Sequence, residues 1–247
     1  MISPNGIKAV LFDLDGTLRH SRPAGHTIFW EFAASLGAPG EKGDRRRAQQ
    51  WAHSYWANSD VLVGDLKALG RNTDEFWQNY ALRHLVALGC TPEQAQELAV
   101  PVRAHMSEAF TPEDWIPPEV PETLARLKSS GFTLGVVTNR SDPIDDYMKD
   151  NGLDVHLDFF FAAGEIGAWK PNPVIFEHAL ERAQVNAGEA IYVGDNYYAD
   201  ILGAQAVGIR AVLLDPDEIF PEADCTVIQD ISEMDGVLSE SIDQGAN

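Results

Sequence analysis

Short apolar runs recur along this sequence, with room for a helix between one run and the next. Each run has the length of a buried β-strand rather than that of a buried helix. We predict strands over residues 7–12, 132–137, 159–162, 190–193 and 210–214. Buried strands that alternate with helices are typical of a parallel sheet covered on both faces. The sequence therefore predicts an α/β fold with a Rossmann-like parallel sheet.

Helix signals fall between these predicted strands. Residues 121–130 have a helical pattern that is followed by a glycine. Asn172 can cap a helix that has Pro173 at its first position and ends near Ala183. A third helix is predicted to begin near Tyr198. These segments provide the helical connections that a parallel sheet needs between its strands.

Residues 19–115 break this alternation. No strand is predicted there, whereas helix signals are frequent. Thr73, for example, can cap a helix that stops at Gly89. We therefore expect an all-helical domain over residues 19–115, inserted into an α/β core that consists of residues 1–18 and 116–247.

The chain carries a formal net charge of −20. Proteins that bind nucleic acids need a basic surface, so we expect no nucleic-acid partner. No stretch reaches the roughly 18 uncharged apolar residues of a membrane span, and no signal core precedes the first strand, so we expect a cytoplasmic protein without a membrane partner. An acidic surface repels phosphate esters, so a site for one must be made locally positive by a metal ion or a lysine.

Two acidic residues, Asp13 and Asp15, directly follow the first apolar run. Side chains two residues apart project the same way from an extended chain, and Gly16 allows the backbone to approach a ligand closely. Such carboxylates can hold a hard cation, or one can act as nucleophile while the other acts as acid and base. A buried strand that leads straight into them favours a site over a solvated turn.

Two further polar motifs follow along the chain. Thr138, Asn139 and Arg140 come directly after the second predicted strand, where a hydroxyl and an amide can bind phosphate oxygens or can simply begin a turn. Lys170 lies just before the start of a predicted helix, where its charge adds to the favourable dipole of the helix. Alternatively, Lys170 is an ordinary surface lysine without a role in a binding site.

A second acidic pair, Asp195 and Asp200, follows the fourth predicted strand. These carboxylates can complete the oxygen shell of a magnesium ion. Asp195 or Asn196 can also cap the helix that follows, which is compatible with metal binding. Ligands of an open parallel sheet lie outside the carboxyl ends of its strands, so the four motifs are expected to meet there. Together they supply a nucleophile, an acid–base group, a cation site and a positive clamp, which phosphoryl transfer requires.

The order of these motifs resembles that of the haloacid dehalogenase-like hydrolase superfamily, over essentially the whole chain. The matching residues are Asp-x-Asp-Gly-Thr at 13–17, Thr-Asn at 138–139, Lys-Pro at 170–171 and Gly-Asp-x-x-x-x-Asp at 194–200. The helical insert matches the cap of that superfamily in position and size. The resemblance implies a magnesium-dependent phosphatase that hydrolyses a small phosphorylated metabolite through an aspartyl-phosphate intermediate.

The resemblance also implies a role for each matching residue. Asp13 attacks phosphorus, while Asp15 protonates the leaving alcohol and then activates the hydrolytic water. Thr138 and Lys170 hold the transferring oxygens. Two further residues are expected to contact the substrate: Asn139 and Arg140.

The implied magnesium site draws on both acidic pairs. Asp13 and Asp195 bind the ion through their side chains, and Asp15 binds it through its backbone carbonyl. Asp200 belongs to the same site and acts through water.

The acid at position 15 also separates the activities of the superfamily. The 2-haloacid dehalogenases typically lack it and work without metal. Phosphonoacetaldehyde hydrolases usually lack it as well and use a cap lysine. Lys42 and Lys67 lie in the cap here, but Asp15 argues against this activity. Mutases of the β-phosphoglucomutase type keep both Asp13 and Asp15, so a phosphosugar mutase stays open beside a phosphatase. A catalytically weak binding protein on the same fold is the remaining alternative.

Overall fold

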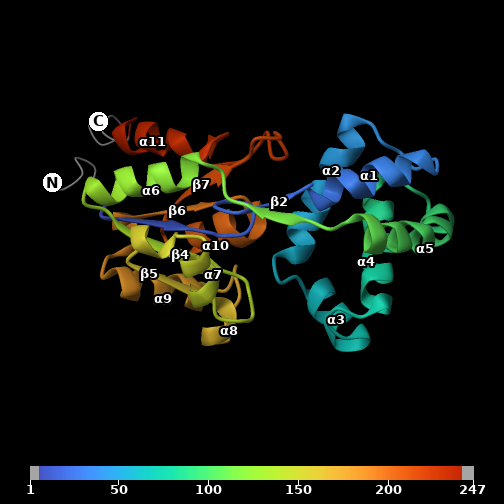
Figure 1. Cartoon of the computed structure of the whole chain (residues 1–247), viewed down its shortest axis with the longest axis horizontal. Helices are drawn as coiled ribbons and strands as arrows, with labels where there is room; N and C mark the ends of the chain where they lie inside the picture. Colours follow the sequence, from blue (N-terminus) through green and yellow to red (C-terminus); the bar gives the residue numbers. More distant parts are fainter. Residues whose placement is uncertain (1–5, 241–247) are drawn as a thin grey trace. The chain divides into compact units, whose positions relative to one another are not determined.

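A computed structural model describes residues 6–240 of the chain. The chain divides into two compact units, which are drawn in Figure 1. One unit joins Met1–His20 with Ile116–Asn247, and the other is Ser21–Trp115. The prediction places the first boundary after residue 18, whereas the contacts within the chain place it after His20.

The first unit contains a six-stranded sheet in the order β5-β4-β1-β6-β7-β8. Every pair of neighbouring strands is parallel. The strands are β1 (Ala9–Phe12), β4 (Thr133–Thr138), β5 (Phe159–Ala162), β6 (Ala190–Gly194), β7 (Arg210–Leu214) and β8 (Thr226–Ile228). All five predicted strands are confirmed. Strand β8 was not predicted because it is short and two of its three residues are exposed at the edge of the sheet, so it leaves no apolar run.

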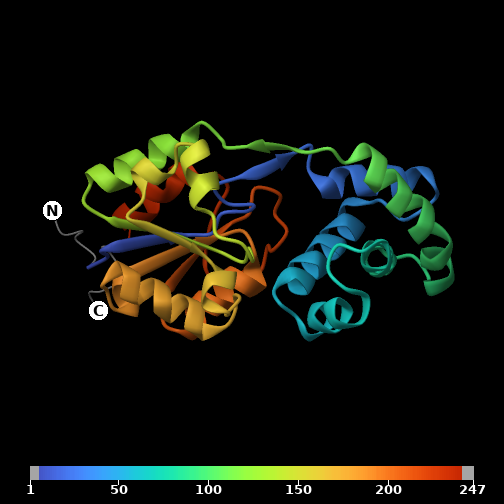
Figure 2. The ribbon, with the colours of Figure 1, turned by 60° about the horizontal axis from the view of Figure 1, so that its bottom comes forward.

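Helices cover both faces of this sheet, as Figure 2 shows. The helices of the unit are α6 (Glu119–Ser129), α7 (Asp145–Asp150), α8 (Ala163–Ile166), α9 (Pro173–Ala183), α10 (Leu202–Ala206) and α11 (Met234–Glu240). Short 3₁₀ turns lie at Asp154–His156, Ala187–Glu189 and Ile231–Glu233. The predicted helix near Tyr198 begins as a π-helical turn, Tyr197–Ile201, and continues as α10.

The central strand β1 shows why helices are needed on both sides. Val10 and Phe12 belong to one hydrophobic cluster, with side chains of α6, α7 and α11. Ala9 and Leu11 belong to a second cluster, with side chains of α8, α9 and α10. Successive side chains of a strand point to opposite faces, so an uninterrupted apolar run requires cover on both. The predicted α/β fold is confirmed.

The second unit has five helices in the part of the chain that the structure describes. They are α1 (Gly25–Ser35), α2 (Lys42–Trp56), α3 (Asp60–Leu69), α4 (Asp74–Leu88) and α5 (Pro92–Ala109). The hydroxyl of Thr73 caps α4 by accepting a hydrogen bond from the backbone N–H of Phe76, and α4 ends at Gly89 in the left-handed conformation, as predicted. Side chains of α1, α2, α4 and α5 share one apolar core.

The prediction of no strand between residues 19 and 115 is wrong at both ends of that segment. Strands β2 (His20–Arg22) and β3 (Glu113–Trp115) form a two-stranded sheet. Both are short and mainly polar, with β2 partly exposed and β3 mostly exposed, so neither carries an apolar pattern. They are strands because segments far apart in the sequence pair with each other, which local sequence does not reveal.

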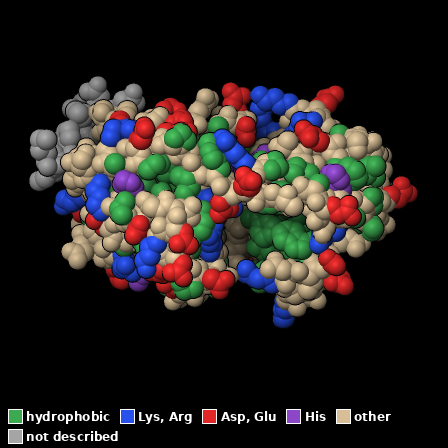
Figure 3. Space-filling model, viewed as in Figure 1, with side chains coloured by type: hydrophobic (Ala, Val, Ile, Leu, Met, Phe, Trp, Pro, Cys, Tyr) green, Lys and Arg blue, Asp and Glu red, His purple; other side chains and the backbone are tan. Residues whose placement is uncertain are grey.

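Among residues 6–240, no helix combines the length and the apolar character that crossing a lipid bilayer requires. Figure 3 shows acidic side chains spread over both units on the face that it presents, as expected for a chain with a net charge of −20.

Candidate active site

Three neighbouring strands bring the predicted motifs together. Strand β1 lies between β4 and β6, and the backbone pairing continues past its end, where the N–H of Asp13 donates to the carbonyl of Val193 at 2.9 Å. Thr138 ends β4, and Asp195 follows the last residue of β6. Because the strands are parallel, their carboxyl ends lie at one edge, which is where open α/β sheets bind ligands.

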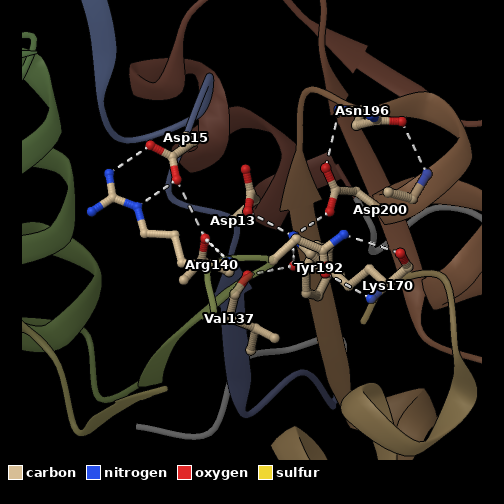
Figure 4. A network of polar contacts seen from close by, with 11 residues as sticks. Asp13, Asp15, Val137, Arg140, Lys170, Tyr192, Asn196 and Asp200 are labelled. Carbon is tan, nitrogen blue, oxygen red and sulfur yellow. Dashed lines mark hydrogen bonds and ion pairs between the residues drawn. The ribbon is translucent and has the colours of Figure 1, made fainter. Parts of the chain in front are cut away.

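Lys170 is the centre of a buried polar network at this edge (Figure 4). Its side chain is 2% exposed, and its ammonium lies 2.6 Å from a carboxylate oxygen of Asp13 and 2.6 Å from one of Asp200. It also donates to the hydroxyl of Tyr192 at 3.0 Å. Burial by itself lowers the pKa of Lys170, but the attraction of Asp13 and Asp200 raises it well above its usual value. The lysine is therefore charged and has a partner for each ammonium hydrogen.

Three carboxylates lie close together at this edge, and two of them pair with Lys170. Asp13, Asp195 and Asp200 each offer one oxygen within 4.8 Å of the others. Burial raises the pKa of Asp13 to about 7; repulsion from Asp200 and Asp15 adds to this effect, and Lys170 opposes it. Burial and repulsion from Asp13 and Asp200 raise the pKa of Asp195 well above its usual value. A single lysine cannot neutralise three carboxylates, so excess negative charge remains, and a bound cation would compensate it.

Two glycines allow the carboxylates to pack so closely. Gly16 has a φ of +95°, and a Cβ at this position would overlap the carboxylate of Asp195. A Cβ at Gly194 would overlap the carboxylate of Asp200 in the same way. Neither position tolerates a side chain unless an acidic residue of the cluster moves.

The carboxyl group of Asp15 lies on the other side of Asp13 from Lys170 in Figure 4. Arg140 donates to both of its oxygens, from Nη2 to Oδ1 at 2.7 Å and from Nε to Oδ2 at 2.8 Å. Arg19 donates to Oδ1 at 3.3 Å, and the hydroxyl of Thr138 donates to Oδ2 at 3.4 Å. The two acids of the first motif therefore have different surroundings, because Asp13 is buried beside a lysine and Asp15 is partly exposed beside two arginines.

Asn139 connects two loops of the site. Its side-chain carbonyl accepts a hydrogen bond from the backbone N–H of Lys170 at 2.7 Å, and its amide nitrogen donates to the backbone carbonyl of Lys170 at 3.0 Å. This pairing holds the loop after β4 against the segment that carries the lysine. A contact between Asn139 and a substrate stays a prediction.

Two residues with a structural part in the site are absent from the predicted set. The hydroxyl of Tyr192, on β6, accepts from Lys170 and donates to the backbone carbonyl of Val137 at 3.1 Å. Its signal in the sequence is a hydroxyl within an otherwise apolar strand, since a buried hydroxyl needs a partner. Asn196 caps the π-helical turn, and its backbone N–H donates to Asp200 at 3.0 Å.

The donor set fits a hard divalent cation. Asp13, Asp195 and Asp200 offer carboxylate oxygens, which are the ligands that Mg²⁺ prefers. The two oxygens of Asp200 accept hydrogen bonds from Lys170 and from the backbone of Asn196. Both oxygens of Asp200 therefore already have a hydrogen-bond donor within the protein.

Comparison with known proteins identifies the family. A model of the haloacid dehalogenase-like hydrolases matches residues 7–208. Ribulose-1,5-bisphosphate 5-phosphatase of Halopiger xanaduensis is 32% identical over 236 residues, which cover 95% of each chain. Phosphoserine phosphatase of Thermus thermophilus is 29% identical over 85% of this chain and 89% of its own. The solved structure of a 2-haloacid dehalogenase from Pseudomonas syringae is 28% identical, with a TM-score of 0.54 over 94% of this chain and 98% of its own. The chain belongs to the haloacid dehalogenase-like hydrolases and is an enzyme of that family.

Proposed function

We propose that this chain is a magnesium-dependent phosphatase that acts through an aspartyl-phosphate intermediate on Asp13. The family match and the phosphatases among its relatives support the class of enzyme. The observation that carries the proposal is the position of Asp13, which lies 2.6 Å from the Lys170 ammonium and within the cluster that it forms with Asp195 and Asp200. A nucleophile beside a lysine and a cation site is what transfer of a phosphoryl group requires.

Each step has a residue to perform it. An oxygen of Asp13 attacks phosphorus, the bond to the leaving oxygen breaks, and that oxygen takes a proton from the carboxyl group of Asp15. In the second step Asp15 takes a proton from water, the water oxygen attacks phosphorus, and the bond to Asp13 breaks. Lys170 and Thr138 hold the transferring oxygens. The products are the alcohol and inorganic phosphate.

Magnesium would be held by Asp13 and Asp195, with the backbone carbonyl of Asp15 and with Asp200 through water. When bound, it supplies the positive charge that offsets the charge of the transferring group. The protein shields this site from solvent, since the side chains of Asp13, Asp200 and Lys170 are at most 7% exposed.

We propose a small phosphate monoester as the substrate. The named activities of the relatives support this class, because ribulose 1,5-bisphosphate and phosphoserine are both small phosphorylated metabolites. A phosphosugar mutase keeps the same two acids and is the second candidate. A 2-haloacid dehalogenase is disfavoured by the acid at position 15, which Arg140 and Arg19 contact within the site.

Phosphate release from p-nitrophenyl phosphate, with and without Mg²⁺, tests the proposal. The wild type is expected to release phosphate only with the metal, and Asp13→Asn is expected to remove this activity while the protein stays folded by circular dichroism. Asp15→Asn is expected to slow turnover. Wild-type rates in both variants would overturn the mechanism. Conversion of a sugar phosphate to an isomer without phosphate release, followed by ³¹P NMR, would instead support the mutase.

A further inference from the structure

Arg140 is held in place on several sides. Its backbone carbonyl accepts from the N–H of Gly164 at 3.1 Å, and its backbone N–H donates to the hydroxyl of Thr138 at 3.4 Å. Its guanidinium lies over the ring of Tyr147, 4.5 Å from the ring centroid. Stacking on an aromatic ring restrains the plane of a guanidinium and limits the directions in which it can donate.

The restrained guanidinium donates two parallel hydrogen bonds from one edge to one carboxylate. Nε and Nη2 of Arg140 contact the two oxygens of Asp15 at 2.8 and 2.7 Å. This two-point pairing defines both the direction and the rotation of the carboxylate, which a single hydrogen bond does not. The Asp15 side chain is 37% exposed, so close packing by itself does not hold it.

We propose that Arg140 is a positioning residue for Asp15, and that it does not bind the transferred phosphoryl group. The inference rests on the proposed function, in which Asp15 gives a proton to the leaving oxygen and takes one from water. A carboxyl group must lie within hydrogen-bond reach of the leaving oxygen to transfer a proton. By orienting Asp15, Arg140 supports the step in which the ester bond breaks. This role differs from the one predicted from the sequence, in which Arg140 contacts the substrate.

The proposal predicts a dependence on the leaving group. A p-nitrophenolate ion leaves as a stable anion, whereas the alkoxide of benzyl phosphate must be protonated as it leaves. The value of kcat/KM covers the steps from substrate binding to release of the first product, so it includes the proton donation to the leaving oxygen and excludes hydrolysis of the aspartyl-phosphate. Loss of Arg140 should therefore lower kcat/KM far more for benzyl phosphate than for p-nitrophenyl phosphate. A residue that binds the phosphoryl group would affect both esters equally, because they share that group.

The experiment compares kcat/KM for the two esters, at saturating Mg²⁺, in a set of variants. Arg140→Ala is expected to lower the value for benzyl phosphate on the order of ten- to a hundredfold, which is part of what a general acid contributes. The value for p-nitrophenyl phosphate is expected to fall less than about threefold by the same reasoning. Arg140→Lys keeps the charge but loses the two-point pairing, so it is expected to recover less than half of the loss. Arg126→Ala, which removes a surface ion pair with Asp235, is the matched control and should leave both values unchanged.

A double-mutant cycle separates positioning from direct contact. If Arg140 acts through Asp15, Arg140→Ala should have little further effect on benzyl phosphate in an Asp15→Ala background. A full loss in that background, or equal losses for both esters in Arg140→Ala, would overturn the proposal. An increase for benzyl phosphate in Arg140→Ala would overturn it as well, because the ion pair would then restrain Asp15 from reacting.

Two controls distinguish failure of the positioning role from failure of the proposed function and from misfolding of the variant. If the wild type hydrolyses neither ester with Mg²⁺, the proposed function fails, whereas a wild type that hydrolyses both with no change of ratio in Arg140→Ala contradicts the positioning role only. If Arg140→Ala does not fold, as judged by thermal unfolding, Arg140→Lys carries the comparison of the two esters and the double-mutant cycle.

Discussion

The ammonium of Lys170 lies 2.6 Å from the carboxylate of Asp13, although the two residues are 157 positions apart in the sequence. Both side chains are buried, at 2% and 7% exposure. A buried ion pair is costly to break, because removing one partner leaves the other charged and without solvent. The ion pair between Lys170 and Asp13 is therefore expected to stabilise the fold, in addition to the role in catalysis that we propose for both residues.

Replacing Lys170 by methionine should lower both stability and activity. Asp13 and Asp200 lose their common partner, so we expect the free energy of unfolding to fall by about 3–5 kcal/mol. Turnover should fall on the order of a hundredfold or more, since a positive charge beside the transferring group is lost. Urea unfolding and steady-state kinetics measure the two effects. Lys8→Met is the control, because its exposed pair with Glu189 should contribute at most about 1 kcal/mol. Equal stability of the two variants would contradict the prediction.

Removing the hydroxyl of Tyr192 should affect kcat more than KM. In Tyr192→Phe, a buried N–H of Lys170 and the carbonyl of Val137 lose their partner, so stability is expected to fall by about 1–3 kcal/mol. The ammonium loses one of its three restraints, and kcat should fall several-fold. Tyr198→Phe is a matched control. Thermal unfolding and kinetics with p-nitrophenyl phosphate check the result, and a change in KM alone would count against it.

A methyl group at Gly194 should weaken magnesium binding. A Cβ there would overlap the carboxylate of Asp200, which must move away from the cluster. We expect Gly194→Ala to raise the Mg²⁺ concentration for half-maximal activity on the order of tenfold, comparable to the loss of an outer-shell partner of a metal site. Gly188→Ala is the control, because among the described residues nothing lies within 4 Å of a Cβ built there. A magnesium titration in which the two variants coincide would refute the prediction.

Magnesium should stabilise the protein against heat. An ion that binds the folded state at a hundred times its Kd adds about 2.7 kcal/mol to the free energy of unfolding. We expect Mg²⁺ to raise the Tm and EDTA to reverse the rise, as measured by differential scanning fluorimetry. Asp195→Asn should remove most of this shift. A shift of the same size in Asp195→Asn would place the ion elsewhere.

His84 should make the helical unit sensitive to acid. The side chain is 3% exposed and stacks on Phe29 at 4.4 Å, and neither ring nitrogen has a hydrogen-bond partner among the described residues. Burial, with some repulsion from His26, lowers its pKa to about 3. A group whose pKa is lower in the folded state stabilises that state above its unfolded pKa of about 6.5, and this contribution is lost as the pH falls.

The matched variant for this test is His84→Phe, which keeps a ring and cannot titrate. Between pH 6 and pH 4, the stability of the wild type relative to this variant should fall by about 1.4 kcal/mol for each pH unit. The comparison cancels the titration of all other groups, provided that both proteins unfold in two states. Urea unfolding over this range is the measurement. A difference that does not vary with pH would contradict the lowered pKa.

Most strands of the sheet could be predicted from local sequence, and the strands that were missed are all at least partly exposed to solvent. Strands β1 and β6 are buried on both faces, so each leaves a continuous apolar run that predicts it directly. Strands β2, β3 and β8 are partly or mostly exposed, so nothing in their composition separates them from loops. These segments are strands because they pair with segments far apart in the sequence, and such pairings cannot be recognised from local sequence.

The candidate site divides in the same way. Asp13, Lys170 and Asp200 could be proposed from the sequence, because each stands where a strand ends or a helix begins and its chemistry suits phosphoryl transfer. Their meeting within hydrogen-bond distance follows from the order of the strands, which places β1 between β4 and β6. The choice between Asp195 and Asn196 as helix cap was also left to the structure, which selects Asn196.

By itself the sequence determined the α/β class and the positions of the acidic and basic motifs, because buried runs and reactive side chains are local properties. Only the tertiary structure decided that Tyr192 supports Lys170 and that Arg140 faces Asp15. The reason is that a hydrogen bond depends on distance and direction in space. Residues 125 positions apart, such as Arg140 and Asp15, acquire these only when the sheet has brought the ends of their strands together.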